Sequence, residues 1–418
     1  MQIRFAVVSD PHVTLPSTLW DHPSRFHLVE VSIPALEQVL QHLVQLPLDF
    51  LLLPGDLTQH GEPENHAWLA ERLARLPFPA FVVPGNHDVP QPKANGRSIG
   101  LADFPRYYQA FGYEDGQSLD YSRLLRPGIR LIGLNSNHFD AQGQLVGCLT
   151  PEQLTWLEKE LAAAEEELVL LMVHHNVVEH LRGQSLHPWG RRYMLENASQ
   201  LRRLLQAYGV QLVFTGHLHI QHIARRGGVY DITTGSLVSF PHPYRLVEIR
   251  SDRETGIQVH VQSYRVGSLP DWPDLQAFSR EWMAQRSEPA VVKFLTSAPL
   301  NLPLEQAQAL APQLRYFWAA VAAGDPDLTF PDFPQPAGRF LERFSRCFRC
   351  PPDNQAQLQF ASNFFSNSFP ISRDPPEGGT LEQPPAAVVD HFVQGHPVCA
   401  SHLQDLGQDL LDLGSPLE

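Results

Sequence analysis

The sequence predicts an α/β protein: a four-layer αββα sandwich of two mixed β-sheets flanked by helices, followed by a mainly helical C-terminal accessory region. Two features of the chain predict the sandwich. Up to about residue 215, short apolar runs alternate with helical patterns, and from residue 229 on, three segments alternate as antiparallel strands do. A βαβ arrangement followed by a run of strands favours two sheets packed face to face with helices outside.

The strands and helices can be assigned in order along the chain. Apolar runs typical of buried strands lie at 3–8, 50–53, 80–83, 129–134, 168–173 and 210–214, and alternating strands at 229–234, 244–250 and 257–265. Helices are expected over 32–45, 63–76, 151–167 and 197–208. Thr150 is the expected N-cap of the third helix, and Pro151 its first residue. Residues 90–126, rich in Tyr and Phe, are expected to form an irregular substrate-side loop with a short helix.

A domain boundary is expected where Gly267, Pro270 and Pro273 cluster. It divides the chain into a first domain, 1–267, and an accessory region, 268–418. In the accessory region we expect helices at 275–286, 303–322, 337–348 and 386–394, and a mobile Pro- and Gly-rich stretch at 373–385. Its apolar helix faces need a surface to pack on, which is either the first domain or a second copy of the chain in a homodimer.

Composition limits the classes of function and location. The 418 residues carry a formal charge of −14, which argues against stable nucleic-acid binding because a phosphate backbone needs clustered cations. No apolar run is long enough to span a bilayer and no leader pattern is present, so we expect no membrane association. Four Cys make no disulfide framework, so a cytoplasmic location is expected.

Five short polar motifs follow the apolar runs. They are Ser9-Asp10-Pro11-His12, Gly55-Asp56, Gly85-Asn86-His87-Asp88, His174-His175 and Gly216-His217-Leu218-His219. In an α/β sheet, such turns present polar side chains in the crevice outside the carboxyl edge. Asp, His and Asn gathered there are what a two-metal hydrolytic site requires.

The order and spacing of these motifs resemble the calcineurin-like metallophosphoesterases over about residues 1–265. The resemblance implies that the domain 1–267 is a phosphoester hydrolase with two metal ions, Mn, Fe or Zn. One ion would be held by Asp10, His12, Asp56 and His219, and the other by Asp56, Asn86, His174 and His217. A hydroxide between the ions would attack phosphorus.

The resemblance also makes His87 and Asp88 the catalytic candidates. His87 would protonate the leaving oxygen or bind a phosphate oxygen, and Asp88 would orient the turn or His87. His175 would face the substrate pocket or lie behind the ligands. No motif supports a role for other histidines, and of these His187 is the favoured exception.

The substrate is expected to be a small phosphoester. The loop containing Trp189 resembles that of bacterial class III cyclic-nucleotide phosphodiesterases, which implies a phosphodiester and possible cyclic-nucleotide substrates. Trp189, Tyr107, Tyr108 and Arg25 would contact a base or phosphate, or the aromatic rings would instead pack the accessory region onto the first domain. A phosphomonoesterase or protein phosphatase would share the metal site, and a partner-binding protein with vestigial activity is a further alternative.

A second metal site is a weaker prediction. Cys347 and Cys350, with Cys399 and His402, form two pairs spaced as in a structural zinc knuckle. The long separation between the pairs favours free buried cysteines instead.

Overall fold

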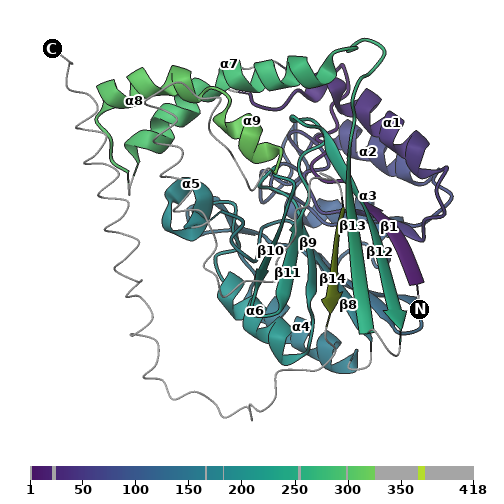
Figure 1. Cartoon of the computed structure of the whole chain (residues 1–418). Helices are drawn as coiled ribbons and strands as arrows, with labels where there is room; N and C mark the ends of the chain where they lie inside the picture. Colours follow the sequence, from purple (N-terminus) through teal and green to yellow (C-terminus); the bar gives the residue numbers. More distant parts are fainter. Residues whose placement is uncertain are drawn as a thin grey trace, which may run out of the picture.

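Two six-stranded sheets form the centre of the molecule (Figure 1). The computed structural model describes residues 2–20, 25–164, 167–181, 183–252, 256–297, 300–324 and 366–371. The first sheet has the order β14 (Ser366–Ile371), β13 (Gly256–Arg265), β12 (Pro243–Asp252), β1 (Gln2–Val7), β2 (Phe50–Leu53) and β3 (Ala80–Val82). The second has the order β10 (His222–Arg226), β11 (Val229–Thr233), β9 (Leu212–Thr215), β8 (Leu168–Val173), β5 (Ile129–Leu134) and β4 (Tyr121–Arg126).

Both sheets are mixed. In the first, β1, β2 and β3 are parallel, whereas β12, β13 and β14 continue the sheet as antiparallel strands. In the second, β5, β8, β9 and β11 are parallel, and β4 and β10 form antiparallel edges. A separate hairpin joins β6 (Asn137–Phe139) to β7 (Leu145–Gly147). The parallel strands end at the same edge of each sheet, which is where the polar motifs follow.

The two sheets pack face to face. Alternate residues along the strands of the second sheet point to opposite sides, so one set of apolar side chains faces the first sheet and the other set faces the outer helices. Leu170 and Met172 of β8 join the core between the sheets, where Phe214 of β9 meets Phe5 of β1 at 5.4 Å between ring centroids. Leu171, between them in sequence, belongs instead to the core on the outer face. This period of two is the expected consequence of strand geometry.

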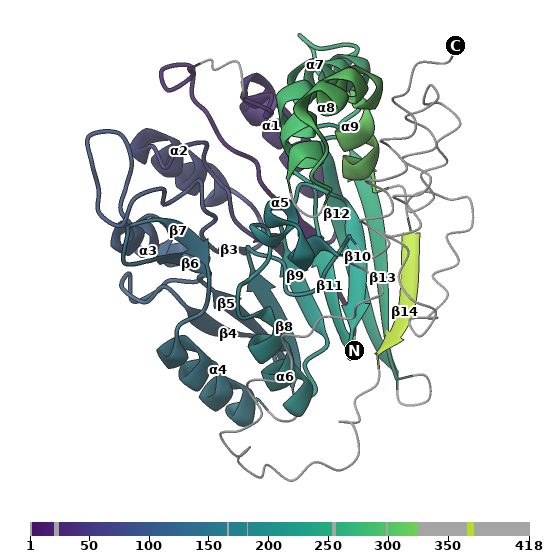
Figure 2. The ribbon, with the colours of Figure 1, turned by 90° about the vertical axis from the view of Figure 1, so that its left-hand side faces the viewer.

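Helices cover the outer faces, which confirms the predicted αββα sandwich. α4 (Pro151–Ala163) and α6 (Ala198–Ala207) bury their apolar sides against the second sheet, and α1 (Ser32–Leu43) and α2 (Pro63–Leu73) lie on the side of the first (Figure 2). Thr150 caps α4 as predicted: its hydroxyl accepts from the Gln153 amide at 3.2 Å. Among the described residues no helix combines the length and apolar character needed to cross a bilayer.

The accessory region differs from its prediction in three ways. α7 (Leu275–Thr296) continues ten residues beyond the expected end, through Pro289. The single helix expected over 303–322 is wrong: Pro312 falls in it, and the chain forms α8 (Leu304–Leu310), a 3₁₀ turn (Ala311–Leu314) and α9 (Phe317–Ala322). The strand β14, which was not expected, pairs with β13. Without β14, the outer edge of β13 would present unpaired backbone N–H and C=O groups.

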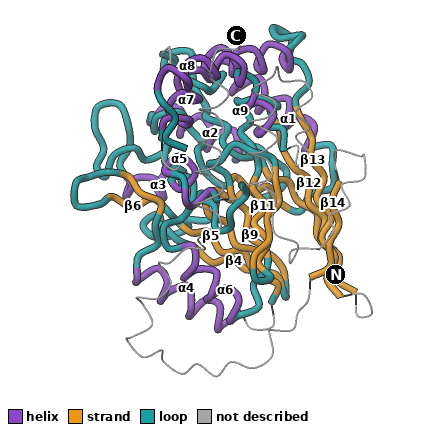
Figure 3. The backbone as a smooth tube through the Cα atoms, turned by 60° about the vertical axis from the view of Figure 1, so that its left-hand side comes forward, coloured by secondary structure: helices purple, strands orange, loops and turns teal. Residues whose placement is uncertain are grey.

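α7, α8 and α9 lie together at one end of the molecule, beyond the strands (Figure 3). They share an apolar core in which Val291 and Leu295 of α7 meet Ala307 and Leu310 of α8, together with Ile220 from the segment between β9 and β10. Part of the apolar helix face is therefore buried on the chain itself, and the homodimer stays a prediction. The expected helices 337–348 and 386–394, the stretch 373–385, and Cys347, Cys350, Cys399 and His402 lie outside the described residues.

Residues 90–126 are more ordered than predicted. They include α3 (Phe104–Tyr107) and end in β4, which the sequence analysis missed. Tyr108 is fully buried, and its hydroxyl donates to His66 Nδ1 at 2.9 Å. The prediction that Tyr108 contacts substrate is therefore wrong, because this aromatic segment packs into the core.

Candidate metal centre and active site

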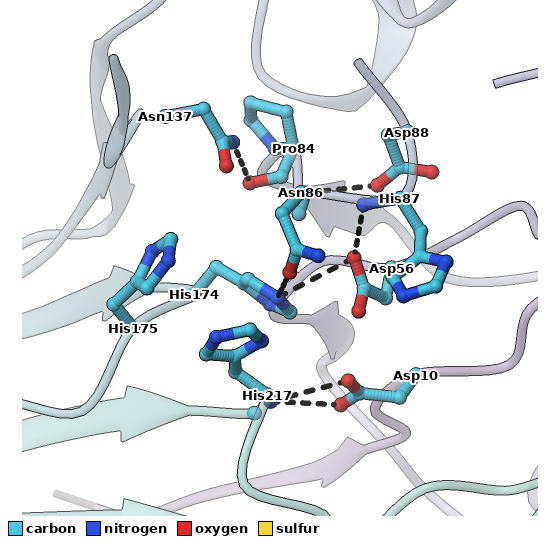
Figure 4. Close-up of polar contacts among 12 residues, drawn as sticks. Asp10, Asp56, Pro84, Asn86, His87, Asp88, Asn137, His174, His175 and His217 are labelled. Carbon is cyan, nitrogen blue, oxygen red and sulfur yellow. Dashed lines mark hydrogen bonds and ion pairs between the residues drawn. The ribbon is translucent and has the colours of Figure 1, made fainter. Parts of the chain in front are cut away.

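The predicted ligands lie together because each follows a strand that ends at the same edge. Figure 4 shows five of them: Asp10, Asp56, Asn86, His174 and His217. β1, β2 and β3 lead into Asp10, His12, Asp56 and Asn86, and β8 and β9 lead into His174, His217 and His219. The site therefore spans both sheets.

The backbone at these motifs is unusual. Seven non-glycine residues of the described chain have positive φ, and five of them are predicted ligands: Asp10, His12, Asp56, His217 and His219, with φ between 41° and 67°. This region is costly for residues with a Cβ, and such strain gathers at functional sites. These turns point the side chains of the five residues toward one another, which the alternating geometry of a regular strand would not allow.

Glycines allow the motif loops to approach one another. A Cβ on Gly216 would collide with the Ser9 hydroxyl and the Asp10 carboxylate, and one on Gly85 would collide with the backbone and carboxylate of Asp56. Gly55 has φ +99°, and a Cβ there would overlap the His174 ring. Gly55, Gly85 and Gly216 are thus required by close packing between loops, and Gly55 also by its positive φ.

Asp10, His12, Asp56 and His219 form the first ligand group. Their ligand atoms all lie within 4.8 Å of one another, so together they could hold one metal ion. His219 Nε2 lies 3.0 Å from Asp10 Oδ1, and His12 Nε2 lies 3.8 Å from Asp56 Oδ2. Carboxylate and imidazole ligands of this kind suit Mn, Fe or Zn.

Asp56, His174 and His217 form the second group, which shares Asp56 with the first. His174 Nδ1 donates to the Pro54 carbonyl at 2.8 Å, which leaves Nε2 facing Asp56 Oδ1 at 3.4 Å and Asn86 Oδ1 at 3.1 Å. His217 Nε2 contacts the Arg192 carbonyl at 3.3 Å, which leaves Nδ1 as its ligand atom. Fixing one ring nitrogen in this way is how proteins orient metal-binding histidines.

Buried atoms without partners show that this site fits metal ions. Both ring nitrogens of His12 and Oδ2 of Asp56 are buried and have no hydrogen-bond partner among the described residues. Leaving such groups unpaired in the interior costs about 1–3 kcal/mol each. Metal coordination would satisfy the Asp56 oxygen and one His12 nitrogen at once.

Burial and neighbouring charges set the protonation states of the histidine ligands. Burial, together with the rings of His27 and His87, keeps the pKa of His12 well below its ordinary value, and burial with His175 does the same for His217. Neutral imidazole is the metal-binding form. At His174 burial opposes protonation, but the carboxylates, mainly Asp56, raise its pKa to about 9. His174 must release this proton to bind a metal.

His87 faces the cavity beside these ligands. Its amide donates to Asp56 Oδ1 at 2.8 Å, and its ring Nδ1 donates to the Gln59 carbonyl at 2.8 Å. Its ring lies edge-on to His12 with centroids 4.7 Å apart. Because Nδ1 is committed to a carbonyl, Nε2 is the atom that can exchange a proton with a substrate.

Asp88 is buried beneath the loops and does not line the cavity. Its carboxylate accepts from the amides of Leu57, Thr58 and Gly85 at 2.8–3.0 Å, tying the Asp56 loop to the Asn86 loop. Burial and the nearby Asp56 raise its pKa to about 7. We therefore assign Asp88 to positioning the loops.

The remaining histidines occupy different surroundings. His175 is buried, with Nδ1 2.7 Å from the Ser136 hydroxyl, and it lies behind the ligands, away from the cavity (Figure 4). His187 caps the short helix α5 (Pro188–Arg191) by accepting from the Trp189 amide at 3.1 Å. His180 and His222 form a separate cluster with Asp231, in which His180 and Asp231 are buried.

The sequence analysis missed His27. Its ring lies 4.1 Å from His12 and 4.8 Å from His219 between centroids, and it lines the cavity. The nitrogens of His12, His27 and His87 also lie close enough together to hold an ion. His27 follows neither a strand nor a glycine turn, so no local signal marked it.

A cavity of about 680 Å³ opens beside the metal ligands. One side is lined by Asp56, Asn86, His87, His217 and His219, and the other by α7, α9 and the Trp189 loop. Trp189 lines the cavity and stacks on Trp318 of α9, with ring centroids 6.3 Å apart. Its predicted packing contact is therefore present, and its contact with a base or phosphate stays a prediction. The volume of the cavity lies within the range of about 300–1,000 Å³ that is typical of small-molecule sites.

A family model for the calcineurin-like phosphoesterases matches residues 3–221. The chain belongs to this family. It is thereby a hydrolase of phosphoric esters, a class built around a two-metal centre, as the resemblance of the motifs predicted.

The chain is similar to proteins named as phosphodiesterases. It is 29% identical over 218 residues to a probable glycerophosphodiester phosphodiesterase of Arcobacter nitrofigilis, covering 51% of this chain and 70% of that one. It is 27% identical over 201 residues to a 3′,5′-cyclic-nucleotide phosphodiesterase of Nostoc, covering 47% and 66%. A solved dimetal phosphatase from Danio rerio is similar over 63% of this chain and 96% of that chain, with a TM-score of 0.45 and 14% identity.

Proposed function

We propose that the chain hydrolyses phosphodiesters at a two-metal centre whose ligands are Asp10, His12, Asp56, Asn86, His174, His217 and His219. The observation that carries this proposal is the convergence of ligand atoms from five strand ends around unpaired buried atoms of His12 and Asp56. Asp56 belongs to both ligand groups, so its carboxylate would contribute to both metal positions.

The metal ions and individual residues have different roles in hydrolysis. Two cations, when bound, supply Lewis acidity and acidify a water molecule. His87 lies at the cavity with Nε2 available, so it donates a proton to the leaving oxygen. Asp88 holds the two loops that carry Asp56 and His87 in register.

The cavity favours a diester over a monoester. A monoester carries one substituent on phosphorus, whereas a diester needs room for two. The space between the ligands and the helices, about 680 Å³, provides that room, and its aromatic wall at Trp189 and Trp318 suits a ring. The names of the similar proteins also support this choice.

Turnover of matched chromogenic substrates tests the proposal. The full chain loaded with Mn²⁺ should cleave bis(4-nitrophenyl) phosphate with a higher kcat/KM than 4-nitrophenyl phosphate. A variant of the exposed His138 serves as a matched control, because it leaves both ligand groups intact. A preference for the monoester above about tenfold, a transition-state difference of about 1.4 kcal/mol, would favour the phosphomonoesterase alternative. Absence of any turnover would favour a partner-binding protein.

A further inference from the structure

The cavity wall opposite the metal ligands is basic, although the chain as a whole is acidic. Four cationic residues line the cavity: Arg25, Arg192, Arg286 and Lys293. Among the lining residues that the structure describes, Asp56 is the only carboxylate, and it belongs to both ligand groups. In a chain with a formal charge of −14, this distribution concentrates positive potential on one side of the site.

Two of these cations flank one indole ring. Arg192 follows α5 and Lys293 lies on α7, and their charged groups are 5.7 Å and 5.8 Å from the Trp189 ring centroid. On α7, Lys293 follows Arg286 and Ala290 at helical spacing, so one face of this helix is turned to the cavity. Arg192 is also joined to the metal side, because its carbonyl contacts His217 Nε2 at 3.3 Å.

These two side chains differ from Arg25 in their partners. Arg25 is paired with Glu30, with Nη1 to Oε2 at 3.1 Å. Within the described ranges, neither Arg192 nor Lys293 forms an ion pair with a carboxylate, and both are exposed. Two unpaired cations beside an indole ring would bind an anion that is attached to an aromatic or heterocyclic group.

We propose that Arg192, Lys293 and Trp189 form a subsite for a second anionic group carried on one ester substituent of the substrate. The inference rests on the proposed phosphodiesterase function and narrows its substrate class to nucleoside-type diesters that bear a further phosphate. The metal ligands would hold the phosphate that is cleaved, and the basic wall would hold the other.

Binding of two matched nucleotides tests this subsite without depending on turnover. Calorimetry on the full chain with Mn²⁺ would compare thymidine 5′-phosphate with thymidine 3′,5′-bisphosphate. We expect the bisphosphate to bind about 10- to 100-fold more tightly, because each charge-assisted contact stabilises it. The preference should shrink toward one in the Arg192→Gln/Lys293→Gln double variant and persist in Arg191→Gln, whose side chain does not line the cavity.

Three results would overturn the subsite. They are equal affinities in the unaltered protein, a preference that survives the double variant, and a double variant that weakens both ligands equally, which would show that the cations hold the first phosphate. The conservative Arg192→Lys/Lys293→Arg variant should retain the preference. Hydrolysis of bis(4-nitrophenyl) phosphate is measured separately: a binding preference without hydrolysis would support the subsite while contradicting the proposed function.

Discussion

The metal-side wall of the cavity and the helical wall are built in different ways. The metal side consists of strand-end turns in which ligands with positive φ are tied by buried hydrogen bonds, such as those of Asp88. The helical side is a face of α7 and α9 packed through apolar contacts and the Trp189–Trp318 pair. The first arrangement fixes a few atoms for chemistry, whereas the second shapes space for a substituent. Variants on the two sides should therefore change different measured quantities.

The largest effect is expected for Asp56→Asn. Asp56 belongs to both ligand groups, so its loss removes charge from both metal positions. We expect kcat to fall roughly a thousandfold or more, because metal ions contribute several kcal/mol of transition-state stabilisation. Elemental analysis should show fewer than two ions per chain. Near-normal turnover with added Mn²⁺ would contradict a bridging role.

The next largest effect is expected for His87→Gln. His87 faces the cavity but has no place in either ligand group that contains Asp56, so both metals should remain. Loss of a general acid should lower kcat by roughly 10²–10⁴-fold, most strongly for poor leaving groups. The test is kcat across a series of aryl esters, with metal content measured in parallel. Loss of metal from this variant would make His87 a ligand.

A smaller effect of a different kind is expected on the helical wall. Trp318→Leu removes a ring that lines the cavity and stacks on Trp189. Aromatic contacts contribute about 0.5–1.5 kcal/mol, so KM for bis(4-nitrophenyl) phosphate should rise roughly 2- to 10-fold while metal content stays the same. Methyl 4-nitrophenyl phosphate, which lacks the second ring, should show less change. Loss of metal from the Trp318→Leu variant would show that the helical wall also affects metal binding.

The last effect concerns stability and leaves turnover aside, and the residue responsible lies beneath the metal-side loops. His66 on α2 is buried, which lowers its pKa to about 3; its Nε2 donates to the Asp88 carbonyl at 3.3 Å. The unfolded chain binds a proton at His66 below about pH 6.5 and the folded chain does not, so stability is full above that pH and falls as pH decreases.

The expected loss from His66 is about 1.4 kcal/mol per pH unit below 6.5. Urea unfolding at pH 7.5 and pH 5 should show a smaller drop in His66→Gln than in the unaltered protein. An equal drop in both proteins would show that His66 does not remain neutral in the folded chain. Comparing the two proteins separates the contribution of His66 from that of other histidines, such as His175 and His222, whose pKa values are also lowered by burial.

The sequence predicts which residues converge on the metal side because its signals there are local. An apolar strand, a glycine and a ligand stand next to one another in the chain, as at Gly216 and His217, and the parallel strands then bring the motifs together. Family membership confirms the predicted fold and hydrolase class, whereas the individual ligand assignments stay predictions.

The helical wall could not be predicted in the same way. Lys293 and Trp318 meet the Trp189 loop through packing between distant segments, and nothing near them in sequence distinguishes them from other helix residues. His27 was missed for the same reason, because only the folded chain brings it to His12. Residues whose role depends on long-range packing leave no local pattern.

Locating the metals directly tests the central claim. Anomalous diffraction from crystals of the full chain grown with Mn²⁺ should show two peaks about 3.5–4 Å apart, on either side of Asp56. One peak should contact Asp10, His12 and His219, and the other should contact Asn86, His174 and His217. A single peak, or a second ion held by His12, His27 and His87 instead, would contradict the proposed centre.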